Sequence, residues 1–455
     1  MIPLKIFVVG GGKVGRTIIE TLVKEGNDIT LIDINEMRVR DISNQFDIMS
    51  FVGNGASYRM LVEAGIKDAD ILIAVTESDE LNILCASVAS QVSSCNTIAR
   101  IRTPDYSEEV WYLRDKLGLT MAINPELECA IEISHILSYP AALDVNVFAR
   151  GEGEVVRFKV TEDSALCGMS LSHFTKSLDV RMIFTAGERE GEVFIPKGSY
   201  KFTCGDVLSF VTSRNDAIDC LKVLGLYHNP LKNCLIIGGG KGAFYLSRIL
   251  DRAGIGVKII EKNYSRCEEI SGKLPRATVI NGDGTDLDVL REEGINYYDA
   301  VVSYTDIDEV NVMLALYANK LPDTKAITKI SRFRFNEVLE ELNLGSVVHP
   351  RRITADAILA YTRAKSGAAG GGDIETLYHM FDDRVEAIEF VITSESEITN
   401  IPLSELTLQP NVVIASIFRG GRMIFPTGGD TLKVEDSVMI VTTNLGYNNI
   451  LEILE

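Results

Sequence analysis

Apolar runs of five to eight residues alternate with amphipathic segments through the first part of the chain. The runs lie at residues 5–10, 28–34, 47–53, 69–76 and 97–101. Between them, apolar residues recur at the 3.6-residue spacing of a helix. This alternation predicts an α/β fold with a parallel sheet covered by helices on both faces. Such sheets bind ligands at the carboxyl ends of their strands.

The same pattern occurs twice in the chain. Residues 5–15 (KIFVVGGGKVG) match residues 233–243 (NCLIIGGGKGA), 228 positions later. The run AVTESDELN at 74–82 matches SYTDIDEVN at 303–311, with an offset of 229. Because order and spacing both repeat over such distances, the sequence indicates an internal duplication.

Each half also contains a second repeated segment of a different character. Residues 194–212 match residues 424–442, and Asp206 aligns with Asp436. Short alternating apolar runs separated by Gly, Pro and Asp predict hairpin strands. Each large βα unit is therefore followed by a smaller α+β unit.

Turn-forming residues separate these units. Residues 227–230 (YHNP) lie between the halves, and residues 366–372 (SGAAGGG) are typical of a flexible linker. The corresponding break in the first half is expected near residues 149–153. We divide the chain into two Rossmann-like nucleotide-binding domains, 1–140 and 232–366, each followed by a small α+β domain, 141–227 and 373–455.

The first glycine-rich turn has the spacing of a dinucleotide-binding site. Gly10, Gly12 and Gly15 follow a strand and open a helix. They allow a tight turn, close approach to a phosphate and close packing of the helix, and the helix N-terminus favours an anion. Asp33 follows at the distance expected for an acid that binds ribose hydroxyls and repels a 2′-phosphate. This favours NAD(H) over NADP(H).

The second copy keeps this arrangement with two differences. Gly238 and Gly240 retain the turn, whereas Ala243 replaces the third glycine and Glu261 replaces the acid. Ala is tolerated at the third position. The alternative for either copy is a Rossmann-like unit that has kept its turn and lost its ligand.

Three further pairs of residues are candidates for ligand contact. Lys13 and Lys241 lie in the turns and either neutralise phosphate or are solvated. Thr76 and Thr305 end the fourth strands, where they contact a nucleotide or help to start the helix that follows Ser78. Arg100 and Lys329 end the fifth strands and pair with phosphate, with an acid across an interface or with a surface acid.

Composition narrows the class of partner. The formal net charge of -19 argues against nucleic acid and against insertion into anionic lipid, and leaves room for a basic protein surface. The eight cysteines form no C-x-x-C pair or zinc pattern, so we expect no metal site and free thiols in a reducing compartment. With no signal peptide or membrane span expected, the predicted location is cytoplasmic.

The small units lack the residues that a dehydrogenase needs. Residues 151–226 contain His173, and residues 385–455 contain no histidine. A proton donor or acceptor beside a nicotinamide is required for hydride transfer. We therefore expect no catalytic residues, and two ligand domains without catalytic groups favour a sensor.

The ordered motifs resemble those of the RCK/KTN family, which regulates potassium channels and transporters. They comprise the glycine turn, the acid, the loop at residues 53–57 or 282–286, the AVTESDELN run and the small hairpin unit. Two copies in one chain are similar to the peripheral subunit of bacterial and archaeal Trk potassium-uptake systems. The resemblance implies binding of NAD(H), and in some members ATP or ADP. It also implies homotetramers that gate a TrkH-like integral membrane subunit from the inner face of the cell membrane.

The resemblance also assigns site residues by position. The first site would use Gly10, Gly11, Gly12, Lys13, Val14, Asp33, Asn54, Thr76, Glu77 and Arg100. The second would use Gly238, Gly239, Gly240, Lys241, Gly242, Glu261, Asp283, Thr305 and Lys329. The sequence departs from the family pattern at Asn54, at residues 303–305 (SYT) and at Ser331, which aligns with Arg102. The second site is consequently poorer in positive charge.

Two other functions remain open from the residues. One is an NAD-dependent oxidoreductase, which the missing catalytic pair in the small units opposes. The other is an assembly subunit whose nucleotide sites are vestigial. Ligand binding and its response to changes at Gly12 or Asp33 distinguish these from a sensor.

Overall fold

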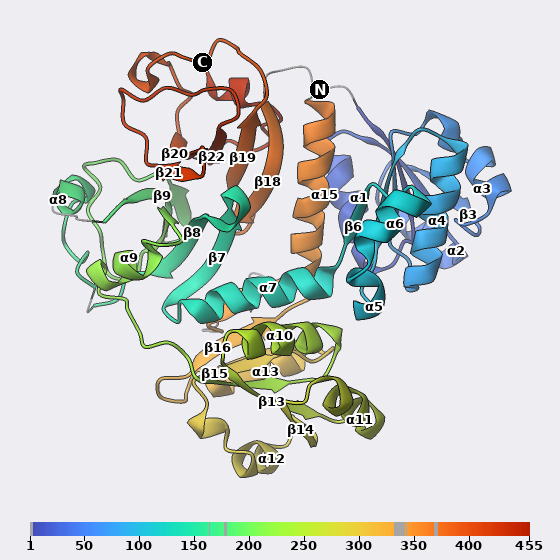
Figure 1. The fold of residues 1–455 in the computed structure, drawn as a ribbon, viewed down its shortest axis with the longest axis horizontal. Coiled ribbons are helices and arrows are strands. Elements are labelled where there is room, and N and C mark those ends of the chain that lie inside the picture. Colours follow the sequence, from blue (N-terminus) through green and yellow to red (C-terminus); the bar gives the residue numbers. More distant parts are fainter. Residues whose placement is uncertain (1–2, 163, 177–179, 332–341, 343, 368–371) are drawn as a thin grey trace. The chain divides into compact units, whose positions relative to one another are not determined.

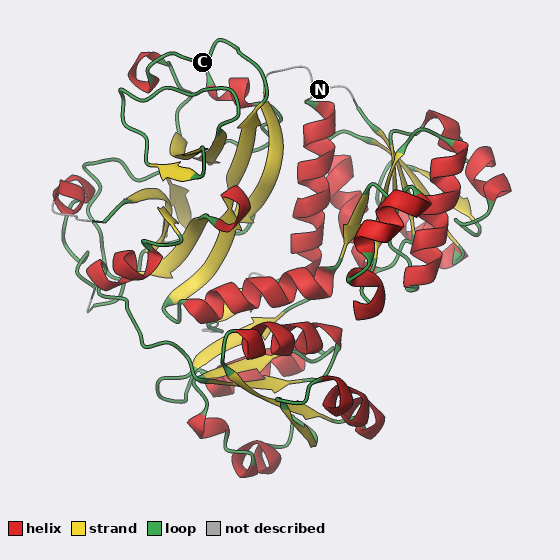
Figure 2. Ribbon diagram, in the orientation of Figure 1, coloured by secondary structure: helices red, strands yellow, loops and turns green. Residues whose placement is uncertain are grey.

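The structure is a computed structural model, which describes the chain except residues 1–2, 163, 177–179, 332–341, 343 and 368–371 (Figure 1). The described residues form four sheets, two of six strands and two of five (Figure 2). In chain order they are a large parallel sheet, a small antiparallel sheet, and then one more of each. The predicted duplication is confirmed at the level of whole sheets.

The first large sheet has the strand order β3-β2-β1-β4-β5-β6, and all its pairs are parallel. In that order its strands are Met49–Val52, Asp28–Asp33, Lys5–Val9, Ile71–Ala74, Asn96–Arg100 and Met121–Ile123. The helices that follow β1 to β4 and β6 are α1 (Lys13–Lys24), α2 (Glu36–Ser43), α3 (Tyr58–Glu63), α4 (Asp79–Val92) and α7 (Pro125–Ser138); β5 is followed by α5 (Pro104–Ser107) and α6 (Val110–Leu117). The order reverses between β1 and β4, so a ligand site is expected at their carboxyl ends.

Strand β1 shows why its sequence is apolar throughout. Ile6 and Val8 pack into a core with residues of α1, whereas Phe7 and Val9 pack into a second core with residues of α4. Because neighbouring strand residues point to opposite faces, both faces of the sheet are covered. Full burial of one such side chain contributes roughly 1.5–3 kcal/mol. The predicted α/β class is confirmed.

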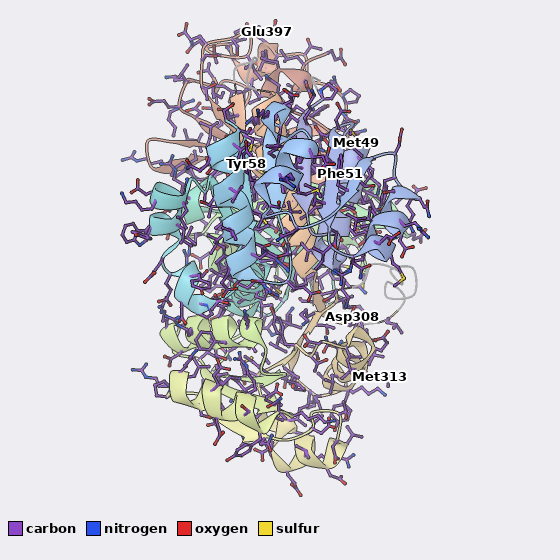
Figure 3. All side chains as sticks on the ribbon, turned by 90° about the vertical axis from the view of Figure 1, so that its right-hand side faces the viewer. Met49, Phe51, Tyr58, Asp308, Met313 and Glu397 are labelled. Carbon is purple, nitrogen blue, oxygen red and sulfur yellow. The ribbon has the colours of Figure 1, made fainter. Side chains whose placement is uncertain are left out.

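The second large sheet repeats the first, with the order β14-β13-β12-β15-β16-β17. Its strands, in that order, are Thr278–Asn281, Gly256–Glu261, Asn233–Ile237, Ala300–Ser303, Lys325–Lys329 and Ser346–Val348. The helices are α10 (Lys241–Arg252), α11 (Tyr264–Lys273), α12 (Leu287–Glu292), α13 (Asp308–Ala318) and α15 (Pro350–Ser366). Asp308 lies at the start of α13, and Met313 lies farther along the helix on its exposed side (Figure 3).

The two small sheets also share one topology. The first has the order β10-β9-β11-β8-β7 and the second the order β21-β20-β22-β19-β18. The first contains β7 (Ala142–Phe148), β8 (Gly153–Lys159), β9 (Met182–Arg189), β10 (Glu192–Phe194) and β11 (Val207–Ser213), with helices α8 (Leu171–Lys176) and α9 (Ala217–Val223). The second contains β18 (Gly372–Met380), β19 (Val385–Ile392), β20 (Val412–Arg419), β21 (Arg422–Ile424) and β22 (Ser437–Thr442).

The repeated aspartate of the small units has a structural role. Asp206 is buried, accepts a hydrogen bond from Arg189 Nε at 2.7 Å and accepts another from the Thr203 N–H at 2.8 Å. Asp436 does the same with Arg419 at 2.6 Å and the Lys433 N–H at 2.7 Å. Each aspartate therefore fixes a hairpin turn onto its sheet.

One expected boundary differs from the structure. Of the residues 149–153 expected to separate two domains, 149–152 connect β7 to β8 and Gly153 begins β8, so this segment lies inside the small sheet. In the second half, α15 continues to Ser366 and β18 begins at Gly372, while residues 368–371 of the expected linker lie outside the described residues.

The compact units of the fold cut across the two large domains. One unit combines residues 1–128 with 350–362, and the other combines 129–349 with 363–455. In the first unit, Ile358 of α15 packs into the core beside α1, and Asn96 Nδ2 donates a hydrogen bond to the Tyr361 hydroxyl. Most of α15 therefore covers the first large sheet, although it follows the second sheet in the chain.

Candidate functional site

The first glycine turn assigns a different task to each of its three spaced glycines. Gly10 has a φ of +104°, and a Cβ there would lie 2.9 Å from the Thr76 nitrogen. A Cβ at Gly15 would lie 1.9 Å from the Gly10 carbonyl oxygen, so only glycine lets α1 start this close to β1. A Cβ at Gly12 would meet no atom of the described residues within 4 Å. Gly12 thus faces open space, where a phosphate could approach the backbone.

The start of α1 suits an anion. The helix begins at Lys13 with Gly12 as its N-cap, and no side chain in the described part of the chain forms a cap hydrogen bond there. Backbone N–H groups and the helix dipole favour negative charge at such an end. Lys13 is exposed beside the turn and Val14 is half-buried. The turn therefore combines space, donors and positive charge.

Asp33 is held rigidly next to this turn. It is buried at the end of β2, where its Oδ2 accepts the Gly11 N–H at 2.6 Å and its Oδ1 accepts the Asn35 N–H at 2.8 Å. Arg38 Nη1 lies 3.8 Å from Oδ2. Each carboxylate oxygen has a further lone pair. The carboxylate can therefore accept a hydrogen bond from a ribose hydroxyl without moving.

The second copy reproduces this acid geometry. Glu261 Oε2 accepts the Gly239 N–H at 2.7 Å, and Oε1 accepts the Asn263 N–H at 2.6 Å. Gly238 has a φ of +109°, and a Cβ on Gly240 would again meet no atom within 4 Å. The two glycine turns therefore share the features that point to a phosphate.

Thr76 is part of a buried polar network that the sequence pattern did not identify. Asn82 Oδ1 accepts the Thr76 N–H and the Thr76 hydroxyl, each at 2.7 Å. Asn82 Nδ2 donates to the Arg100 carbonyl at 2.9 Å. Asn311 binds Thr305 and the Lys329 carbonyl in the same way. The asparagine repeats six residues after each threonine, and this repeat was the available signal.

Arg100 is brought to the same edge of the first sheet. Its side chain is buried and donates to the Thr76 carbonyl. Burial lowers the pKa of its guanidinium, and the neighbouring Arg102 lowers it further. Arg100 Nε is buried and has no hydrogen-bond partner among the described residues. Glu77 is exposed nearby and lies 3.5 Å from Arg38.

The second site differs where Tyr304 replaces Val75. A Cβ on Gly242 would lie 2.3 Å from the Tyr304 ring, so this glycine makes room for an aromatic side chain. Lys329 Nζ lies 4.9 Å from the centre of the same ring and 3.5 Å from Asp306 Oδ1. Lys241 is half-buried at the start of α10. The cation opposite the turn is therefore Lys329 held over a ring, instead of a buried arginine.

The third loops also differ between the copies. Asn54 is exposed and its Oδ1 accepts the Ala56 N–H at 3.0 Å. Asp283 accepts the Thr285 N–H at 3.0 Å and pairs with Lys262 at 2.7 Å. Lys262 and the Thr285 hydrogen bonds lower the pKa of Asp283 to about 2. An ion pair thus occupies the edge of the second site where the first has none between the matching residues.

Two apolar side chains beside Asp33 were missed by the sequence reasoning. Ile34 and Met37 are each 74% exposed. Their counterparts in the second copy are Lys262 and Ser265. Exposed apolar side chains next to a ribose-binding acid offer a surface for a planar base. Only the difference between the copies could have signalled them.

The described residues contain no cluster of three or more His, Cys, Asp or Glu placed to hold a metal ion. No helix in the described part of the chain combines the length and apolar character needed to cross a bilayer.

Comparison with known proteins places this geometry among related chains. The TrkA-N domain model matches residues 6–125 and 234–350, and the TrkA-C domain model matches residues 155–225 and 387–454. The Trk system potassium uptake protein TrkA homolog 1 of Methanosarcina mazei is 32% identical over 445 residues, covering 96% of this chain and 97% of its own. The TrkA protein of Haemophilus influenzae is 31% identical over 446 residues, covering 96% and 95%.

Solved structures share the fold at low sequence identity. The structure described as the GsuK channel bound to NAD has a TM-score of 0.64 at 15% identity, covering 97% of this chain and 77% of that one. The structure described as GsuK bound to ADP has a TM-score of 0.52 at 14% identity, covering 80% and 70%. At these identities, both structures support the fold of this chain and nothing further.

Proposed function

The chain belongs to the family of Trk-system potassium uptake proteins TrkA, and from this premise we propose that it is a nucleotide-sensing regulatory subunit of a potassium uptake transporter. It binds NAD(H) at its glycine turns, with ATP or ADP as competing ligands. It gates a TrkH-like integral membrane subunit as a homotetramer at the inner face of the membrane. The observation that carries the proposal is the rigid pairing of the open Gly12 backbone with Asp33, repeated by Gly240 and Glu261.

The residues of the first site favour an adenine dinucleotide that lacks a 2′-phosphate. Asp33 would accept ribose hydroxyls, and its negative charge would repel a 2′-phosphate. Ile34 and Met37 would cover the base. The second site, with Lys262 and Tyr304 in place of apolar residues, would bind the same class of ligand with different affinity. NAD(H) therefore occupies the first site preferentially.

Gating requires unequal affinity of the ligand for two states of the assembly. A coupling free energy of about 1–3 kcal/mol is typical of such systems. The net charge of -19 favours contact with a basic surface of the membrane subunit over contact with anionic lipid. The same pairing of turn and acid occurs in oxidoreductases, so the rival function is hydride transfer. A regulatory subunit binds NADH without consuming it.

The test is calorimetric titration of the full chain with NADH, NAD, ATP and ADP, combined with an assay for NADH oxidation. A Cβ on Gly12 or Gly240 meets nothing within 4 Å, so Gly12→Ala and Gly240→Ala leave the fold intact and block phosphate approach. We expect Gly12→Ala to weaken binding at the first site at least tenfold. Gly272→Ala, in α11 and equally open, is the matched control. Wild-type protein that binds none of these nucleotides, or that turns NADH over with a carbonyl substrate, contradicts the proposal.

A further inference from the structure

We propose that Cys167 and Cys204 form an oxidisable dithiol site that closes into a reversible disulfide on the first small sheet. Both side chains are exposed, whereas the other six cysteines are buried. Exposed thiols that lie close together are the ones that thiol–disulfide exchange can reach. This site is independent of nucleotide binding.

Backbone pairing brings the two cysteines to one place. Ser170 and Lys201 form an antiparallel bridge, and Gly168 N–H donates to the Phe202 carbonyl at 3.0 Å. Cys167 directly precedes Gly168, and Cys204 lies two residues beyond Phe202. Because the two segments run antiparallel, both cysteines lie on the same side of this hydrogen bond.

The second small sheet shows that the fold does not require thiols here. The equivalent hydrogen bond joins Asn400 N–H to the Leu432 carbonyl at 2.8 Å, and an antiparallel bridge joins Pro402 and Thr431. The positions that correspond to the two cysteines hold Thr399 and Val434. Since the same backbone pairing forms without cysteines in the second sheet, the fold of the first sheet does not require Cys167 and Cys204.

The chemistry needs an oxidant, and we assign it to a low-molecular-weight disulfide. One cysteine thiolate attacks a sulfur of that disulfide, releasing one small thiol and leaving a mixed disulfide. The second cysteine thiolate then attacks the protein sulfur of the mixed disulfide and releases the second small thiol. Two protein thiols are oxidised and one small disulfide is reduced to two small thiols, with two protons passing to solvent or to those thiols.

Both thiols are free in the structure. Partial removal from water raises the pKa of the Cys204 thiol, and the neighbouring Cys167 raises it further. Cys204 is therefore protonated at neutral pH, and the exchange quickens as the pH rises. Closure ties the turn at residues 164–169 to the turn at 203–206, which Asp206 holds to the sheet.

Trypsin separates the two cysteines, so the bond is directly observable. Residues 160–176 and 202–214 are tryptic peptides with one cysteine each. We expect the native full chain, incubated with oxidised glutathione and then alkylated, to yield these peptides joined by a disulfide at least tenfold above any other cysteine pair. Dithiothreitol should separate them. Urea-unfolded protein should lose the preference.

Three variants make the result decisive. Cys204→Ser should leave Cys167 as a glutathione mixed disulfide, and Cys167→Ser should leave Cys204 in that form. Cys95→Ser, which removes a buried thiol in the first large domain, should leave the joined peptides unchanged. Native wild-type protein that carries two separate glutathione adducts and no joined peptides overturns the proposal, as does pairing of either cysteine with a third.

Discussion

Asn82 accepts both polar hydrogens of Thr76 through a single amide oxygen, at 2.7 Å each. The same amide group reaches across to the Arg100 carbonyl at 2.9 Å. Asn82 is fully buried, so water cannot replace these bonds. The carboxyl ends of β4 and β5 are therefore fixed to the first turns of α4, at the sheet edge where the candidate site lies.

Replacing Asn82 with Ala should destabilise the first large domain. The change leaves the Thr76 N–H and the Arg100 carbonyl buried without this partner, and each such group costs about 1–3 kcal/mol. We expect the free energy of unfolding in urea to fall by at least about 2 kcal/mol. Thr76→Ser, which keeps a hydroxyl and an N–H, is the control and should cost far less. A loss below about 0.5 kcal/mol for Asn82→Ala would contradict the role of this network.

The sequence predicted those features whose chemistry is local. The tasks of Gly10 and Gly15 follow from their spacing behind a strand, and Asp33 follows from its position at the end of the next strand. The structure agrees on the geometry of all three. Each depends on residues that are near in the sequence or joined by one parallel pairing.

Contacts between distant elements could not be predicted in this way. Tyr361 receives a hydrogen bond from Asn96, which is 265 positions away, and periodicity does not specify which helix covers a sheet face. The motif alone assigns Gly242 to a ligand. Only the fold shows that the Tyr304 ring lies against this glycine, which therefore makes room for the ring. The pattern does not identify Asn82, because an asparagine in a helical pattern is usually solvent-exposed.

Changing Asp33 to Asn should weaken NADH binding and relax selection against a 2′-phosphate. Gly11 and Asn35 both donate to the carboxylate, whereas an amide offers one acceptor and one donor group. One backbone N–H must then face an NH₂ group, and the repelling charge is lost. We expect about a tenfold loss of NADH affinity, which corresponds to about 1.4 kcal/mol, and a smaller ratio between NADH and NADPH affinities.

Calorimetry of the wild type and variant with both cofactors measures this change. Asp28→Asn, at the exposed start of the same strand, controls for loss of charge alone. Unchanged affinity for both cofactors in Asp33→Asn would show that Asp33 holds the turn without contacting the ligand.

Two buried hydroxyls in the second large sheet should be replaceable with a gain in stability. Ser303 and Thr328 are neighbours in the pairing of β15 with β16, and neither hydroxyl has a hydrogen-bond partner among the described residues. The first sheet has Ala74 and Ala99 at the matching positions. A buried hydroxyl without a partner costs about 1–3 kcal/mol relative to water.

The double change Ser303→Ala with Thr328→Ala should therefore raise the free energy of unfolding by about 1 kcal/mol or more. Urea titration followed by fluorescence or circular dichroism measures it. The reverse pair, Ala74→Ser with Ala99→Thr, should destabilise the first sheet. A loss of stability in the alanine variant would indicate that an ordered water satisfies both hydroxyls.

His135 of α7 should make the protein less stable in mild acid. Burial lowers the pKa of its imidazole to about 4, and the charge of Arg214 adds to this effect. In the unfolded chain the pKa is about 6.5, so between these values the unfolded state binds the extra proton. The free energy of unfolding consequently falls as the pH drops from 6.5 to 4, by up to about 3 kcal/mol from this group. Below pH 4 both states are protonated and the contribution stays constant.

His135→Gln should remove this component from the pH profile of urea unfolding, whereas His228→Gln, at an exposed position, should retain it. If the profiles of wild type and His135→Gln run parallel from pH 6.5 to 4, the imidazole is protonated in the folded state and the assigned burial effect is wrong.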